Sequence, residues 1–182
     1  MKPISRPSWD AYFMALAKLV ASRSTCLSRP TGCVIVKDKQ IISTGYNGSM
    51  PGVAHCLEEG RCYRRSINAP DAGKYDFCRS IHAEANAIAL AGRKGLDLEG
   101  STIYVTLFPC YVCTKLLVRA GVKEVVYESG YESENQTRDR HWTEALKESG
   151  LKIRQFELDA KDSLFLISFL QGKTSVRRIK SE

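Results

Sequence analysis

Long apolar runs are missing from this chain of 182 residues. No stretch of 18 or more uncharged apolar residues occurs, and the most apolar candidate, residues 9–21, is interrupted by Asp10 and Lys18. Because a bilayer-spanning helix needs about 20 such residues, we expect no membrane span. The same segment lacks the basic-then-apolar layout of a secretion signal, so we expect a cytoplasmic protein.

An even cysteine count is missing as well. The chain has seven cysteines, and without a secretion signal a disulfide framework is not expected. Metal ligation is then the better explanation of their clustering. The formal net charge of +7 favours anionic partners such as nucleotides, nucleic acid or acidic proteins. A modest basic excess is also common on an ordinary solvated surface, so charge alone does not choose among these partners.

Internal repeats are absent too, and the length limits the number of domains. A chain of 182 residues with 43% hydrophobic content can bury one solid core but is short for two. We therefore predict one domain over residues 1–182. Its basic tail, from about residue 173, is expected to fray because chain ends make few contacts.

The order of the apolar patterns predicts alternating helices and strands. A helix capped by Ser8 is expected to end near Arg23, because its apolar residues have helical spacing. Residues 33–36 and 41–44 are predicted to form an antiparallel hairpin. Further helices are expected at 83–91, 111–120, 143–149 and 163–170, and further strands at 101–107, 124–127 and 151–156. This order predicts the α/β class, as a three-layer α/β/α sandwich with a mixed sheet of about five strands.

One long segment stands apart because it shows little periodicity. Between residues 45 and 80 the chain has five glycines, two prolines and three cysteines. A loop of this length inside a compact domain is usually functional or held in place by something. We interpret residues 46–80 as a cysteine-bearing insertion.

Two predicted helix starts carry residues suited to zinc chemistry. His82 opens the helix 83–91, and Cys110 and Cys113 open the helix 111–120. Zinc binds histidine nitrogen and cysteine sulfur in a tetrahedron, and a catalytic zinc site keeps its fourth position for water. A gap of two residues lets both sulfurs reach one ion from a single helical turn, where the helix N-terminus favours thiolates.

Glu84 would supply the acid–base group. It lies two residues after His82, near enough to exchange protons with a water on the same ion. Taken alone, His-x-Glu occurs by chance, and Cys-x-x-Cys also forms structural zinc clips and redox pairs. The two motifs together, His-x-Glu and Pro-Cys-x-x-Cys, are the recorded signature of zinc deaminases. We therefore predict a catalytic zinc held by His82, Cys110 and Cys113, with Glu84 as general base and acid.

Longer motifs narrow the resemblance. From about Trp9 to Phe156 the chain resembles the deoxycytidylate (dCMP) deaminase family, including its bacterial late-competence type. The motifs that carry the resemblance are Arg23-Ser24-Thr25-Cys26, Gly45-Tyr46-Asn47-Gly48, His55-Cys56, Gly60-Arg61-Cys62, Cys78, Ile81 to Ile88, Ser101 to Thr106 and Pro109 to Cys113.

The resemblance implies a cytidine-deaminase-like fold and a homo-oligomer. It also implies conversion of dCMP to dUMP and ammonia, which supplies dUMP for thymidine nucleotide synthesis. Two places depart from the family pattern: Thr31-Gly32-Cys33 stands where Val-Gly-Ala is usual, and Met50 where proline is common. Details of the substrate pocket therefore depend on this chain's own residues.

The resemblance also points to residues that bind the substrate. Asn47 resembles the family residue that hydrogen-bonds the sugar, and Tyr131 resembles the aromatic residue that closes over the base. A turn asparagine and a surface tyrosine are the plain alternatives. Phosphate recognition needs a cation or a helix N-terminus, and Arg23 and Arg29 flank the segment expected to border the pocket. Either arginine could instead be merely solvated.

The remaining cysteines suggest a second metal site. Four cysteines lie outside both the predicted catalytic site and the predicted strands: Cys26, Cys56, Cys62 and Cys78. Four thiolates form a closed structural zinc site, which would fasten the insertion to the end of the first helix. His55 could replace one of them, and buried or free thiols are the alternative. We therefore expect two zinc ions per chain.

Regulation is implied by the resemblance as well, through activation by dCTP and inhibition by dTTP with Mg²⁺ present. We place the effector site at Gly45-Tyr46-Asn47-Gly48, because glycines expose backbone amides to phosphates. Arg93, at the far end of the catalytic helix, could relay the signal to a neighbouring subunit. Alternatively, the segment only shapes the substrate pocket and Arg93 caps its helix.

Three rival functions share parts of this pattern. A tRNA adenosine deaminase or other polynucleotide deaminase would have both zinc motifs and suit the positive charge, but would not be expected to combine residues 45–48 with the insertion. The insertion also disfavours a free-nucleoside cytidine deaminase. A non-catalytic zinc module that binds nucleic acid would not need Glu84. We therefore expect a nucleotide substrate, and neither nucleic acid nor a membrane as partner.

Overall fold

The centre of the fold is a five-stranded mixed sheet. A computed structural model describes residues 6–70, 75–130 and 136–172. The strand order is β2-β1-β5-β6-β7. The strands are β1 (Gly32–Lys37), β2 (Gln40–Tyr46), β5 (Thr102–Leu107), β6 (Glu124–Ser129) and β7 (Lys152–Gln155). β1 runs antiparallel to β2 and β5, whereas β5, β6 and β7 are parallel. The predicted mixed sheet of five strands is confirmed.

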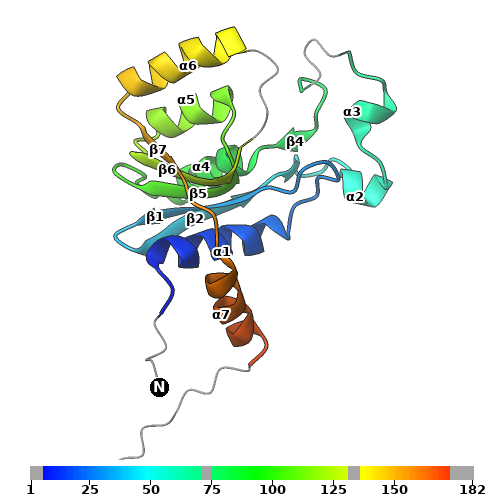
Figure 1. The fold of residues 1–182 in the computed structure, drawn as a ribbon. Helices are drawn as coiled ribbons and strands as arrows, with labels where there is room; N and C mark the ends of the chain where they lie inside the picture. Colours follow the sequence, from blue (N-terminus) through cyan, green and yellow to red (C-terminus); the bar gives the residue numbers. More distant parts are fainter. Residues whose placement is uncertain (1–5, 71–74, 131–135, 173–182) are drawn as a thin grey trace, which may run out of the picture.

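Helices cover both faces of this sheet (Figure 1). The helices are α1 (Trp9–Ala21), α4 (Ala83–Lys94), α5 (Tyr111–Arg119), α6 (Gln136–Glu148) and α7 (Ala160–Leu170). α1 packs on one face, and α4, α5 and α6 lie on the other. α7 follows β7 and extends away from α1. The three-layer α/β/α architecture is therefore also confirmed.

The central strands are buried on both faces. Cys33 and Ile35 of β1 belong to the core beneath α4, whereas Val34 and Val36 belong to the core beneath α1. Because successive strand residues point to opposite faces, a strand covered on both sides is a continuous apolar run. This is why residues 33–36 could be predicted as a strand from the sequence.

Short elements that the sequence did not predict fill the insertion. β3 (Gly48–Ser49) pairs antiparallel with β4 (Ser80–Ile81), and α2 (Cys56–Glu59) and α3 (Tyr63–Ser66) lie between them. Elements of two to four residues are too short to produce a periodic pattern. The start of α6 was also predicted wrongly: the helix begins at Gln136, not near residue 143, because its first turns are mostly polar.

Two expectations fall on parts of the chain outside the described residues. These are the frayed basic tail from residue 173 and the base-covering role of Tyr131. Within the described ranges, no helix is both long enough and apolar enough to cross a bilayer.

A polar network fastens α1 to the last strand. Arg154 of β7 donates hydrogen bonds to both carboxylate oxygens of Asp10 at 2.8 Å and to Glu124 at 3.0 Å. The Tyr104 hydroxyl donates to Asp10 Oδ1 at 2.8 Å. The hydrogen bonds from Arg154, and then the one from Tyr104, hold the pKa of the Asp10 carboxyl below its usual value despite partial burial. A two-pronged arginine–carboxylate contact of this kind fixes orientation as well as distance.

Replacing Asp10 with Asn tests this network. The amide still accepts a hydrogen bond from Tyr104, but it loses the charge pairing with Arg154. We expect the free energy of unfolding at pH 7 to fall by about 1–3 kcal/mol, measured by urea unfolding.

The same comparison has a defined pH dependence. A carboxyl whose pKa is lowered in the folded state stabilises the protein at pH values above its unfolded-state pKa of about 3.9. This contribution is lost as the pH falls through the folded-state pKa. The difference between the wild type and Asp10→Asn should therefore shrink below about pH 4. Asp97→Asn, which breaks an exposed ion pair with Lys37, serves as a control with a smaller effect. Equal destabilisation by both variants would contradict the role of the network.

Candidate metal centre and active site

Two helices begin side by side at one edge of the sheet. His82 is the N-cap residue of α4 and Cys110 is the N-cap residue of α5. Both have extended backbone, and neither side chain caps its own helix by a hydrogen bond. Cys113 lies one turn into α5 and is buried. Because α4 packs against α5, the three side chains come together from two separate segments.

The spacing of these side chains fits a tetrahedral zinc ion. His82 Nδ1 lies 3.4 Å from Cys110 Sγ and 3.5 Å from Cys113 Sγ. All three ligand atoms lie within 4.8 Å of one another. Zinc bonds of about 2.1 Å to nitrogen and about 2.3 Å to sulfur, meeting at a tetrahedral angle, would place nitrogen and sulfur about 3.6 Å apart. The three residues could therefore hold one zinc and leave its fourth position free.

The three side chains are coupled by shared protons. A hydrogen bond from Cys113, helped by His82, lowers the pKa of the Cys110 thiol to about 4. The pKa of Cys113 is raised because it holds the proton that it donates to Cys110. The hydrogen bond with Cys110 raises the pKa of His82. A zinc ion would take the place of these shared protons, since metal binding releases protons from its ligands.

Glu84 is buried next to this centre. It lies in the first turn of α4, and only 4% of its surface is exposed. Burial raises the pKa of its carboxyl above the usual value, and the charge on Cys110 acts in the same direction. Its own backbone N–H and His82 oppose this shift. A carboxyl whose pKa moves towards neutrality can both accept and donate a proton.

The start of α4 is held directly against the end of β2. A Cβ atom at Gly45 would lie 2.1 Å from the backbone oxygen of Ala83, so only glycine fits there. Asn86 Nδ2 donates to the backbone oxygen of Tyr46 at 2.9 Å. These contacts fix the helix turn that carries His82.

The segment 45–48, predicted as an effector site, has a packed backbone. The Asn47 N–H donates to the Thr31 oxygen at 3.1 Å, and Gly48 pairs with Ile81 of β4. Gly45 is in contact with the backbone of α4, as described above. Arg93 lies exposed in the last turn of the same helix.

Asn47 is buried and organises the chain between α1 and β1. Its Oδ1 accepts hydrogen bonds from Ser24 Oγ at 2.6 Å and from the Thr31 N–H at 2.8 Å. Its Nδ2 donates to the backbone oxygen of Arg29 at 2.9 Å. An amide nitrogen carries two hydrogens, so one is left for a ligand. This structural role of Asn47 could not be recognised from the sequence.

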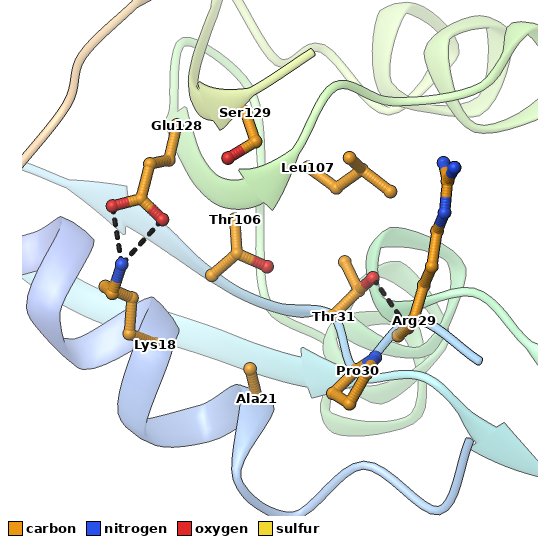
Figure 2. Close-up of a pocket in the computed structure, with 9 residues that line it drawn as sticks. All are labelled: Lys18, Ala21, Arg29, Pro30, Thr31, Thr106, Leu107, Glu128 and Ser129. Carbon is orange, nitrogen blue, oxygen red and sulfur yellow. Dashed lines mark hydrogen bonds and ion pairs between the residues drawn. The ribbon is translucent and has the colours of Figure 1, made fainter. Parts of the chain in front are cut away.

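A cavity of about 380 Å³ opens at the same edge of the sheet (Figure 2). It lies between the end of α1, residues 29–31, and the carboxyl ends of β5 and β6. Leu107 in its wall is three residues before Cys110, but Lys18 and Ala21 come from α1, on the face of the sheet opposite α4 and α5. Arg29 lines this cavity, and Arg23 is not among its lining residues.

The lining residues that sequence reasoning missed include Lys18, Glu128 and Ser129. They are single polar residues without a motif. In open α/β sheets, however, ligands bind outside the carboxyl ends of the parallel strands. That rule would have indicated residues 128–129 once the strand 124–127 had been predicted.

The four cysteines assigned to a second metal site are spread around the insertion. All four are half-buried free thiols: Cys26, Cys56, Cys62 and Cys78. Within the described residues, His82, Cys110 and Cys113 form the one group of three ligands that converge within 4.8 Å. His55 is the N-cap residue of α2 and accepts a hydrogen bond from the Glu58 N–H at 3.1 Å. The side chains of these four cysteines therefore do not converge on one point, whereas those of His82, Cys110 and Cys113 do.

Known proteins are similar to this chain in sequence and in fold. Residues 7–129 match the family described as "Cytidine and deoxycytidylate deaminase zinc-binding region". The chain is 38% identical over 167 residues to "Deoxycytidylate deaminase" of Saccharomyces cerevisiae, covering 92% of this chain and 51% of that protein. It is 40% identical over 178 residues to "ComE operon protein 2" of Bacillus subtilis, covering 93% of this chain and 86% of that protein.

A solved structure supports the fold independently. The dCMP deaminase from the cyanophage S-TIM5, in complex with dCMP and dUMP, superimposes with a TM-score of 0.63 at 24% identity, covering 84% of this chain and 99% of that one. The chain spans about half the length of two yeast relatives, 51% and 47%. The matched family region contains both helix starts that build the zinc-type centre. This chain therefore belongs to the cytidine and deoxycytidylate deaminase zinc-binding family.

Proposed function

We propose that this protein is a zinc-dependent hydrolase that converts dCMP to dUMP and ammonia and so supplies dUMP for thymidine nucleotide synthesis. The observation that carries the proposal is the convergence of His82, Cys110 and Cys113 beside the buried carboxyl of Glu84. Relatives named deoxycytidylate deaminase, at 38% and 43% identity, support dCMP as the substrate.

Glu84 performs the proton transfers in this proposal. A zinc ion held by the three ligands would lower the pKa of a bound water to about 7. The Glu84 carboxylate accepts a proton from the attacking water, passes it to N3 of cytosine and then assists the departure of ammonia from C4. The water oxygen becomes the C4 carbonyl; one of its hydrogens ends on N3 and the other leaves with ammonia. Burial of Glu84 keeps bulk water away from the proton being moved.

An ammonia-release screen tests the substrate. The zinc-loaded protein should release ammonia fastest from dCMP when offered dCMP, CMP, dCTP, deoxycytidine and tRNA at equal concentrations. A preference for tRNA would instead indicate a polynucleotide deaminase, and release from no substrate would leave a non-catalytic zinc module.

Glu84→Gln tests the proton transfers. The amide keeps the shape of the side chain but cannot move a proton, so we expect kcat to fall roughly 100- to 10,000-fold. Zinc content and dCMP binding should be retained. Glu148→Gln, at an exposed position in α6, should behave like the wild type. Near-normal turnover in Glu84→Gln would exclude this residue as the proton carrier.

We also propose that residues 1–182 form one deaminase domain whose insertion, residues 46–80, is held by a second, structural zinc. Its ligands would be Cys26, Cys56, Cys62 and Cys78, with His55 as a possible substitute. All four are free thiols, and three of them, Cys56, Cys62 and Cys78, lie within the insertion, which supports the proposal. Because they do not yet converge, zinc binding would have to draw these segments together.

Metal analysis tests the two sites together. Protein purified without chelator should contain about two zinc ions per chain, one for each set of ligands. Cys56→Ser should lose one ion and lower the melting temperature, and His82→Ala should lose the other. A single zinc, lost only in His82→Ala, would remove the second site and leave the first.

We further propose a homo-oligomer that dCTP activates and dTTP inhibits, with Mg²⁺ accompanying these nucleotides, through residues 45–48 and Arg93. Exposed apolar side chains support an assembly, since such patches often mark protein contacts: Leu170 of α7 is 76% exposed and Val112 of α5 is 60% exposed. The position of Arg93 at the end of the catalytic helix supports a relay between subunits.

Rate curves test the regulation. An effector acts only if it binds two states differently. The rate plotted against dCMP concentration should therefore be sigmoidal alone and hyperbolic with dCTP present. Hyperbolic curves throughout, unchanged by dCTP or dTTP with magnesium, would remove the regulation while the catalytic proposal stands.

A further inference from the structure

The polar helix α6 is attached to the body of the protein by few apolar side chains. Trp142 and Leu146 pack against the core beneath α4, whereas the other described side chains of α6 are mostly exposed. A helix in a folded protein is held mainly by the apolar face that it buries. Trp142 is therefore one of the residues that fix the position of α6.

The ring of Trp142 lies against the turn that carries two of the zinc ligands. Its centroid is 5.0 Å from that of the Tyr111 ring, and the two ring planes meet at 70°. This is the edge-to-face geometry that aromatic pairs favour. Tyr111 is the first residue of α5 and directly follows the ligand Cys110. A contact that holds the Tyr111 ring therefore limits the movement of the ligand beside it.

The inner side of the same turn is fixed by Thr114. This buried residue donates to the Cys110 carbonyl from its N–H at 2.9 Å and from its hydroxyl at 2.8 Å. On the outer side, Val112 is 60% exposed, whereas Tyr111 is half-buried and in contact with Trp142. The turn is thus held from the inside by hydrogen bonds and from the outside by a ring on another helix.

Farther along the two helices, a cavity of about 560 Å³ lies between α5 and α6. Residues of both helices line it, among them Lys115, Val118 and Ala145. Figure 1 shows the two helices in the same layer, on one face of the sheet. Because side chains do not fill this space, the later turns of α5 receive less support from α6. The ring pair, at the other end, is the contact through which α6 reaches the start of α5.

The indole nitrogen of Trp142 indicates that the ring, and not its N–H group, is what this position uses. Trp142 Nε1 is buried and has no hydrogen-bond partner in the described part of the chain. A buried donor without an acceptor lowers stability, and buried tryptophans usually find a partner. A phenylalanine would avoid this cost and would still offer a ring to Tyr111.

We propose that Trp142 is a positioning residue for the metal centre: its ring holds the Tyr111 ring and thereby keeps Cys110 and Cys113 directed at the ion. The inference rests on the zinc site of the proposed function and goes beyond it, because it gives α6 a part in that site. Groups behind metal ligands commonly change metal affinity or activity about 10- to 100-fold. A ring contact without a hydrogen bond to the ligand should have a smaller effect.

Metal release tests the proposal without relying on turnover. Trp142→Leu keeps an apolar side chain that can attach α6 but removes the ring, so zinc transfer to a chromogenic chelator should be roughly 3- to 10-fold faster than from the wild type. Trp142→Phe keeps a ring and should release zinc at the wild-type rate, with a melting temperature that is unchanged or raised. The chain has one other tryptophan, and Trp9→Phe, at an exposed position in α1, is the matched control.

Cobalt substitution and kinetics report the geometry of the site. In the Co²⁺-loaded protein, Trp142→Leu should alter the visible absorption bands of the tetrahedral centre, and Trp142→Phe should not. For the zinc-loaded protein, kcat for dCMP should fall in Trp142→Leu, with KM unchanged. Tyr111→Leu should have the same effects, and the double variant should add nothing further, because both changes remove the same contact.

The contrary results are equally specific. Wild-type zinc release and cobalt spectra in Trp142→Leu would overturn the proposal, and so would additive effects of Trp142→Leu and Tyr111→Leu. A lower melting temperature with normal zinc release would make Trp142 an ordinary core residue. If Trp142→Leu does not fold, Tyr111→Leu, which leaves α6 attached, decides by the same measurements. If the wild type deaminates no nucleotide while Trp142→Leu still releases zinc faster, this inference stands and the proposed function fails.

Discussion

The close approach of α4 to the end of β2 is the contact on which the metal centre depends. Because Gly45 has no side chain, the backbone of Ala83 can lie where any Cβ would be 2.1 Å from its oxygen. The first turn of α4 is thereby brought to the sheet edge at which α5 begins. His82 and Cys110, which are 28 positions apart in the chain, can then direct their side chains at one point. A bulkier residue at Gly45 would displace the ligand and the buried carboxyl together.

Opposite charges are balanced over short distances at this edge. Two helix N-termini, each with a partial positive charge, face the Cys110 and Cys113 sulfurs. In the cavity of Figure 2, Lys18 pairs with Glu128, and Arg29 is the lining cation without a partner in the described part of the chain. This local arrangement, more than the overall net charge of +7, sets the charge at this edge of the sheet.

The parts of the structure that could be predicted from the sequence are those with a repeated or spaced signal. Residues 33–36 are apolar on both faces, so the central sheet and the helical layers on its two faces could be predicted. The motifs around His82 and Cys110 contain metal ligands at fixed intervals, so the zinc-type centre could be predicted as well. The pairing of Gly48 with Ile81 and the hydrogen bonds of Asn47 join residues distant in sequence and leave no local pattern. The four cysteines in and near the insertion are a different case. Their number suggested a second metal site, but their sulfur atoms do not converge in the structure.

The contact between Arg154 and Asp10 has a consequence for how the chain is made. The two residues are 144 positions apart, and Tyr104, which also bonds Asp10, is 94 positions away. During synthesis α1 emerges first and β1, which packs against it, follows closely, yet its polar partners and the core residues Tyr104 and Val126 follow much later. Contacts this distant in sequence form slowly, and unburied apolar surface on a growing chain invites aggregation. The N-terminal helix therefore gains its full set of contacts only after β7 has left the ribosome.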